Sequence, residues 1–88
     1  MDDDVRHRLN LLDALLAAAE RPHEVLDLVL SAADAEEATA AVAGALGTSP
    51  PAARAVLDAQ WRGLTRQGLQ RLHAERDDLR ARAPGPVL

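Results

Sequence analysis

The sequence predicts an all-α protein, a compact bundle of about five helices in which the two longer outer helices run antiparallel. Apolar residues recur at steps of three and four along most of the chain, which is the helical period. Proline, glycine and capping residues divide this pattern into segments. The composition is 48% hydrophobic, mostly Ala, Leu and Val, with Trp61 as the single aromatic residue. Such a composition favours helices packed by small and aliphatic side chains over a sheet.

The first helix is expected from about Asp4 to Glu20. Acidic residues at positions 2–4 place negative charge at its N-terminus, where the helix dipole favours it. Apolar residues at steps of four, three and four form one stripe, which two further leucines widen. The stripe consists of Val5, Leu9, Leu12 and Leu16, with Leu11 and Leu15 beside it. Pro22 then ends the first helix and is suited to the first turn of a second.

The second helix is short and heavily apolar, over the segment PHEVLDLVLSA. Its four largest central side chains are expected to be buried: Val25, Leu26, Val29 and Leu30. A third helix, AEEATAAVAGAL, follows Asp34, which is placed to cap it with Glu37 as the capping-box partner. Gly47 supplies the left-handed residue that ends this helix.

The fourth helix is expected to begin with Ser49 as its cap and Pro50 in its first position, and to run to about Arg62. Gly63 weakens its end. Thr65 is placed to cap a fifth helix over residues 66–82. The apolar stripe of that helix contains Leu69, Leu72 and Leu79, with Arg76 on the same line. Residues 1–83 are therefore predicted to form a single helical domain, and residues 84–88 a frayed tail.

Charge is unevenly distributed along the chain, whose net charge is −4. The acids crowd the first half, and seven of the ten arginines lie between Arg54 and Arg82. One interpretation is that acidic and basic helices pair with each other or with a partner protein. The other is a phosphate-binding face. The net charge argues against direct nucleic-acid binding by charge alone.

No stretch reaches the ~20 apolar residues of a membrane span, and the N-terminus lacks the order of a signal peptide, so we expect a cytoplasmic protein.

No residue pattern in the chain is typical of an active site. There is no cysteine, and His7, His23 and His73 lie far apart without the spacing of metal ligands. Ser31 and Ser49 lie at expected helix boundaries, where termination or capping explains them. The glycines follow no phosphate-loop pattern. We therefore expect no catalytic, cofactor-binding or metal-binding residues, no cofactor, and no enzyme activity.

One further pattern is carried by Leu15, Leu16, Glu24, Val25, Leu26, Glu36, Glu37, Ala38, Leu46, Gly47, Ser49, Ala55, Val56, Leu57, Asp58, Leu64, Thr65, Leu69, Glu75 and Leu79. With these residues, the stretch from Glu24 to Thr65 and its neighbours resemble the segment at the lower dimer gate of the DNA-cleaving subunits of bacterial type IIA topoisomerases, the DNA gyrase A protein and its topoisomerase IV counterpart. The order and spacing of the helices agree without gaps over most of residues 7–80. The chain departs from the family pattern at Ala59, Gln60, Trp61 and Gly63, and it has no Tyr to act as the DNA-cleaving nucleophile.

The resemblance implies a gate module, comparable to the C-gate of DNA gyrase, that lacks the catalytic parts of a topoisomerase. On this basis we expect a non-catalytic dimerisation or interaction module that forms a homodimer. Its candidate interface is Val56, Leu57, Trp61 and Leu64. Trp61 either fills the small core or contributes to the interface. One alternative is a regulator that binds the host gyrase A protein or its topoisomerase IV counterpart by mimicking the gate, and another is an unrelated small helical scaffold protein.

Overall fold

The computed structural model describes residues 3–59 and 61–82, except for the side chains of Trp61 and Arg62. Within these residues the chain forms five α-helices, one 3₁₀-helix and no strand, so the all-α prediction is confirmed. The expected frayed tail at residues 84–88 lies outside the described residues. The elements are α1(Asp3–Glu20), α2(Pro22–Ser31), α3(Ala35–Leu46), α4(Pro50–Asp58), the 3₁₀-helix η1(Trp61–Leu64) and α5(Arg66–Arg82).

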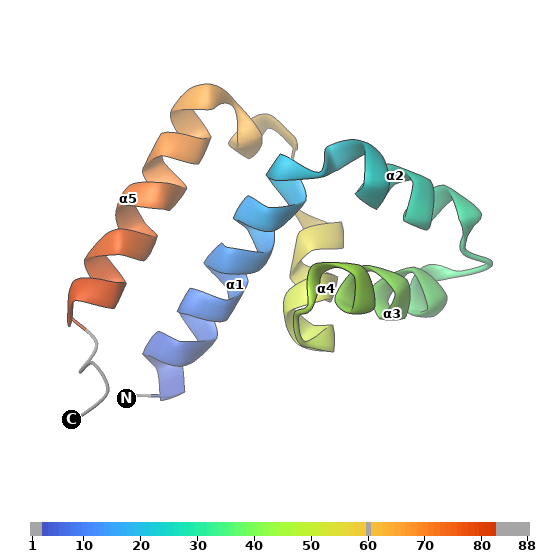
Figure 1. Cartoon of the computed structure of the whole chain (residues 1–88), viewed down its shortest axis with the longest axis horizontal. Coiled ribbons are helices and arrows are strands. Elements are labelled where there is room, and N and C mark those ends of the chain that lie inside the picture. The colour runs from blue at the N-terminus through green and yellow to red at the C-terminus, as the bar shows by residue number, and fades with distance from the viewer. Residues whose placement is uncertain (1–2, 60, 83–88) are drawn as a thin grey trace.

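Helix α1 lies at the centre of the molecule. Helix α5 returns alongside it in the opposite direction, while α2, α3 and α4 gather on its other side (Figure 1). The antiparallel arrangement of the two long outer helices is as the sequence predicts. Because α1 is covered from two sides, its buried residues do not form one narrow stripe; they are Leu9, Leu12, Ala14, Leu16 and Ala18.

Helix boundaries follow the capping residues. The Asp34 carboxylate accepts a hydrogen bond from the Glu37 N–H at 2.8 Å, and the Glu37 carboxylate reaches back to the Ala33 N–H. The Ser49 hydroxyl accepts from the Ala52 N–H, and the Thr65 hydroxyl accepts from the Gly68 N–H. These bonds satisfy N–H groups that have no partner within the first turn of a helix. All three predicted caps are therefore confirmed.

The core is built from small side chains. Among the side chains that the structure describes, Leu12 and Val42 are the largest that are fully enclosed. One cluster joins α1, α2, α3 and α4 through Ala18, Val25, Val42, Ala43 and Ala53. The molecule is flat, with extents of 44 × 28 × 18 Å. Its radius of gyration is 13.7 Å, against about 12 Å for a compact domain of this length. Many leucines and valines therefore stay half-buried, and α5 has no buried residue.

The fourth helix is shorter than the sequence predicts. Helix α4 ends at Asp58 rather than near Arg62, and Ala59 adopts an extended conformation with ψ of 142°. The chain then forms η1 before α5 begins. A continuous helix would carry the chain away from α1, whereas the extended residue and the 3₁₀ turn redirect it so that α5 can pack back on α1. Tertiary packing thus overrides the helical pattern here.

Among the described residues, the ion pairs Arg8–Glu75 and Arg80–Asp13 connect the outer helices. Arg8 donates to both carboxylate oxygens of Glu75, at 2.7 and 2.8 Å. Arg80 donates to both oxygens of Asp13, at 3.1 and 3.2 Å. Each helix supplies one arginine and one acid, so the prediction that oppositely charged helices pair with each other is correct for α1 and α5. Both helices therefore contribute an acidic and a basic side chain to these pairs, rather than one helix contributing only acids and the other only bases.

Candidate functional site

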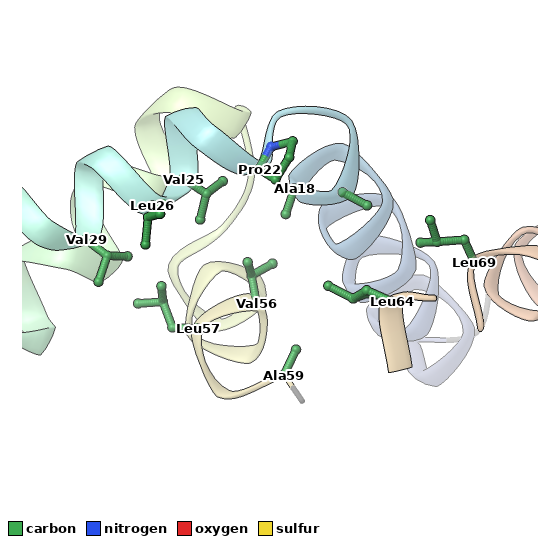
Figure 2. Close-up of a pocket in the computed structure, with 11 residues that line it drawn as sticks. Ala18, Pro22, Val25, Leu26, Val29, Val56, Leu57, Ala59, Leu64 and Leu69 are labelled. Carbon is green, nitrogen blue, oxygen red and sulfur yellow. The ribbon is translucent and has the colours of Figure 1, made fainter. Parts of the chain in front are cut away.

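An apolar groove of about 440 Å³ lies where four helices and η1 meet. Figure 2 shows side chains from α2 facing side chains from α4, with the C-terminal end of α1 between them and Leu64 and Leu69 at the far side. Every lining side chain is apolar: Ala18, Ala19, Pro22, Val25, Leu26, Val29, Val56, Leu57, Ala59, Leu64 and Leu69. Because no polar side chain lines it, the cavity is suited to apolar groups, such as apolar side chains from a partner.

Three of the four residues predicted for the dimer interface lie in this groove. Val56 and Leu57 come from the last turns of α4, and Leu64 comes from the end of η1. All three are half-buried. Val56 and Leu57 also pack against the core cluster, so they support the fold as well as the groove wall. The side chain of the fourth residue, Trp61, lies outside the described part of the chain.

Helix α2 is less buried than the sequence predicts. Val25 is buried and Val29 is half-buried, but Leu26 is 44% exposed and Leu30 is 74% exposed. The expectation that all four side chains would be enclosed is therefore wrong for Leu26 and Leu30. Helix α2 packs mainly on α3 and touches α1 only near their junction, so its far side has no covering element. Leu26 and Leu30 are one turn apart and share that side.

These two leucines are the functional candidates that sequence reasoning missed, although a signal was present. Helix α2 places apolar residues at five of the six positions from Val25 to Leu30. A helix that is apolar around most of its circumference needs neighbours on all sides. A flat molecule only 18 Å thick in its shortest dimension does not provide them.

The helices that form the groove also carry exposed charged residues. Lining residues on the α1–α2 side are followed directly by the exposed acids Glu20 and Asp27, which form no ion pair with a described residue. Arg21 and Glu24, on the same side, neutralise each other. Helices α4 and α5 carry Asp58 together with Arg54 and Arg66, all exposed and without an ion-pair partner among the described residues.

Arg21 also fixes the corner at which the groove begins. Its guanidinium donates to the backbone carbonyl of Ala45, near the end of α3, at 3.0 Å, and to the carboxylate of Glu24. An arginine at a helix C-terminus satisfies a carbonyl group that the helix itself leaves free. The contact joins the α1–α2 corner to α3, and so holds Pro22 and Val25 in position at the groove.

The histidines and serines lie where the sequence places them. His7, His23 and His73 are all exposed. Ser49 caps α4, and Ser31 is the last residue of α2. Across residues 3–59 and 61–82, no group of His, Asp or Glu residues is arranged to hold a metal ion. The one buried polar residue in this part of the chain, Thr39, donates its hydroxyl proton to the Ala35 carbonyl.

The ion pair between Arg8 and Glu75 shifts the pKa of both its members. The hydrogen bond from the Arg8 guanidinium, reinforced by its charge, holds the pKa of Glu75 below its ordinary value. The same hydrogen bond raises the pKa of Arg8. Both side chains are about two-fifths exposed, and they lie on the α1–α5 seam rather than in the groove. This perturbation therefore reflects a structural contact, not an acid–base site.

Compared with protein-family models, curated proteins and solved structures, the chain has no significant match. The resemblance to the gyrase gate segment therefore stays a prediction. Among the described residues, no helix has the length and apolar character required to cross a membrane.

Proposed function

We propose that this chain is a non-catalytic protein-interaction module that forms a homodimer through the apolar groove. The observation that carries this proposal is the groove itself, which is lined only by apolar side chains and lies beside two exposed leucines. Exposed apolar patches of a few hundred Å² on small proteins mark contact surfaces. Burying the groove and Leu30 removes from water both of the large apolar side chains that the described residues leave exposed, Leu26 and Leu30.

The small size of the chain supports the same proposal. A domain of this length buries only about 60–65% of the surface of its unfolded chain. Its core side chains are mostly Ala and Val, and no disulfide is available because the chain has no cysteine. Small domains without such links commonly gain stability by oligomerisation, and a two-fold dimer is the commonest closed assembly.

The test is sedimentation equilibrium of the purified chain between about 1 and 200 µM. We expect a dimer at the upper end of this range, with circular dichroism dominated by helix at all concentrations. A chain that remains monomeric at 200 µM contradicts the proposal.

Trp61→Ala distinguishes the two roles that the sequence leaves open for this residue. A loss of more than ~2 kcal/mol in dimerisation assigns it to the interface, and a loss of ~3–5 kcal/mol in folding assigns it to the core.

A second candidate function is regulation of gyrase or topoisomerase IV through the gate of the DNA-cleaving subunit. Val56, Leu57 and Leu64, which occupy positions matched to the gate segment, all line the groove. This favours the groove as the face that would pair with such a gate. The test is co-sedimentation of the chain with purified gyrase A protein, together with plasmid supercoiling by the complete enzyme. Inhibition that Leu57→Ser abolishes supports this function. Unchanged supercoiling in excess chain contradicts it.

A further inference from the structure

We infer that two copies of this chain exchange α5: η1 and α5 swing out together about Ala59, and α5 of each copy packs on α1 of the other. The contact between α1 and α5, here called the α1–α5 seam, then joins two copies in a domain-swapped dimer. This inference goes beyond the proposed function, because the copies are joined by the seam and not by docking on the groove. It is carried by the packing of α5, by the ion pairs of the seam and by the conformation of Ala59.

Helix α5 is held to the rest of the molecule mainly through α1. It packs on α1 and on η1, and it lies on the opposite side of α1 from α2, α3 and α4 (Figure 1). None of its residues is buried, and its apolar residues Leu69, Leu72 and Leu79 are half-buried. The core cluster contains no residue of α5, so displacement of α5 uncovers one side of α1 and leaves the cluster intact. Exchange of such an element between identical chains is a low-cost route to a dimer.

The α1–α5 seam identifies a second copy as the partner. Arg8 donates to both carboxylate oxygens of Glu75 at 2.7 and 2.8 Å, and Arg80 donates to both oxygens of Asp13 at 3.1 and 3.2 Å. These pairs depend on α1 and α5 and not on the connection between α4 and α5. A second copy brings an α5 with the same charges and the same leucines, so it satisfies every contact of the seam. The closed monomer and the swapped dimer therefore share the seam and differ in the connection.

The connection contains a residue whose conformation opposes its helix propensity. Ala59 ends α4 in an extended conformation, with φ of −65° and ψ of 142°, although alanine has the highest helix propensity of all residues. A change of ψ to the helical value of about −42° continues α4 and carries η1 and α5 away from the α1 of their own chain. Hinges are residues at the ends of elements that absorb such a change. Opening at Ala59 removes the conflict between local propensity and fold, and a second copy then restores the seam.

The 3₁₀-helix η1 moves with α5. The two elements pack on each other, and the hydroxyl of Thr65, which lies between them, accepts a hydrogen bond from the Gly68 N–H at 3.1 Å. Leu64 of η1 and Leu69 of α5 line the same side of the groove (Figure 2). Both leave the groove when Ala59 opens. In the swapped dimer the groove is completed by the partner's Leu64 and the partner's Leu69, so the second copy contributes residues to the groove as well as to the seam.

The first experiment reverses the charges of the seam in two separate chains, which are unfolded and then refolded together. One chain carries Arg8→Glu and Asp13→Arg in α1, and the other carries Glu75→Arg and Arg80→Asp in α5. Each chain alone places like charges opposite each other at both pairs, as a monomer and as a swapped homodimer. Only the swapped heterodimer has opposite charges at every pair. We expect native mass spectrometry to show this heterodimer at least about tenfold above either homodimer.

The control is a single chain that carries all four substitutions, because its reversed charges match within the chain. It should fold as the wild-type chain does. When it is refolded together with the wild-type chain, every seam of a swapped heterodimer brings like charges together. The heterodimer should therefore fall below the statistical proportion in this mixture, whereas it exceeds that proportion in the first mixture. Copies that dock without exchange of α5 give the statistical proportion in both.

The second experiment weakens the open conformation of the hinge. Ala59→Gly in both charge-reversed chains should raise the Kd of their heterodimer at least about fivefold, because glycine disfavours the helical conformation that opening requires. Ala40→Gly is the matched control, since Ala40 is an exposed alanine within α3 that stays helical in the closed and open forms. It should lower the stability of the fold and leave the heterodimer Kd within about twofold of its original value.

The outcomes separate this inference from the proposed function. Heterodimers in statistical proportion in both mixtures overturn the exchange of α5 and leave the proposed homodimer standing. Chains that form no dimer in any mixture overturn both. Excess heterodimer in the first mixture, together with a wild-type chain that stays monomeric, supports the exchange and contradicts the proposed homodimer. A heterodimer Kd that Ala59→Gly leaves unchanged overturns the assignment of Ala59 as the hinge.

Discussion

Gly68 lies directly against the backbone of Gly63. A β-carbon built on Gly68 would lie 2.0 Å from the Gly63 carbonyl oxygen and 2.8 Å from its carbonyl carbon. Gly63 belongs to η1 and Gly68 to the first turn of α5. The close approach of the two backbones allows the chain to reverse between these elements and α5 to return along α1. Helix α5 therefore depends on a glycine at a position where a helix would otherwise favour alanine.

We expect Gly68→Ala to destabilise the fold by about 1–3 kcal/mol, because the added methyl group forces the turn apart. The strain should outweigh the ~1 kcal/mol by which alanine stabilises a helix interior relative to glycine. The measurement is urea unfolding followed by circular dichroism at 222 nm. Gly44→Ala in α3 is the control, since nothing lies within 4 Å of its β-carbon position. It should be stabilising by ~0.5–1 kcal/mol. Equal effects of the two substitutions would contradict the role given to Gly68.

Gly47 should be sensitive for a different reason. Its φ of 64° places it in the left-handed region, where it ends α3, although the space around it is open. Gly47→Ala should therefore cost about 1 kcal/mol from backbone strain alone. Gly47→Asn should cost less, since asparagine tolerates this conformation better than alanine does. The same urea experiment measures both. If alanine proves as stable as asparagine here, strain at this residue is not what makes glycine necessary.

Leu12 and Leu30 differ in how much of the side chain is exposed to solvent. Leu12 is fully enclosed, whereas Leu30 is 74% exposed. Leu12→Ala should lower the free energy of unfolding by about 2–5 kcal/mol, because it leaves a cavity between α1 and its neighbours. Measured at a concentration where the chain is monomeric, Leu30→Ala should change that free energy by less than ~0.5 kcal/mol. A large loss from Leu30→Ala under these conditions would show that α2 is packed differently.

The Arg8–Glu75 pair should make a small, pH-dependent contribution to stability. The pKa of Glu75 is lower in the folded chain than in the unfolded one. Its stabilisation is therefore fully present above the unfolded pKa of about 4.3 and is lost as the pH falls through the folded pKa. Because both side chains are substantially exposed, the loss from Glu75→Gln at pH 7 should be below ~1 kcal/mol. Unfolding of both proteins between pH 2 and 7 should show the difference disappearing at the acid end.

Local signals were sufficient to predict most of the helix boundaries. Asp34, Ser49 and Thr65 each have a side-chain oxygen that accepts a hydrogen bond within the next few residues, so their effect does not depend on the rest of the fold. Gly47 is similar, since its conformation is set by the end of its own helix. The end of α4 depends instead on how α5 packs against α1. No residue near Asp58 marks that end, and the helical pattern continues through it.

The groove could be predicted only in part. Val56, Leu57 and Leu64 are predicted from the resemblance to the gyrase gate segment, which places a dimer contact in this region. The opposite wall of the groove comes from α2, over 25 residues earlier in the chain. Which apolar residues of α2 are enclosed depends on how many helices surround it. Periodicity indicates the faces of a helix but not the number of its neighbours. For that reason Leu26 and Leu30 were expected in the core and are exposed.

The two ion pairs between α1 and α5 together determine how far one helix can slide along the other. Arg8 and Asp13 are five residues apart, as are Glu75 and Arg80. The helices run in opposite directions, so five residues forward on α1 and five residues forward on α5 are displacements of opposite sign along the common axis. The axial offset between the partners therefore differs by about 15 Å between the two pairs, and the lines that join the paired residues cross. Sliding α5 along α1 in either direction shortens one span and lengthens the other. Half-buried leucines alone would tolerate a shift by one helical turn, whereas the crossed pairs favour a single register.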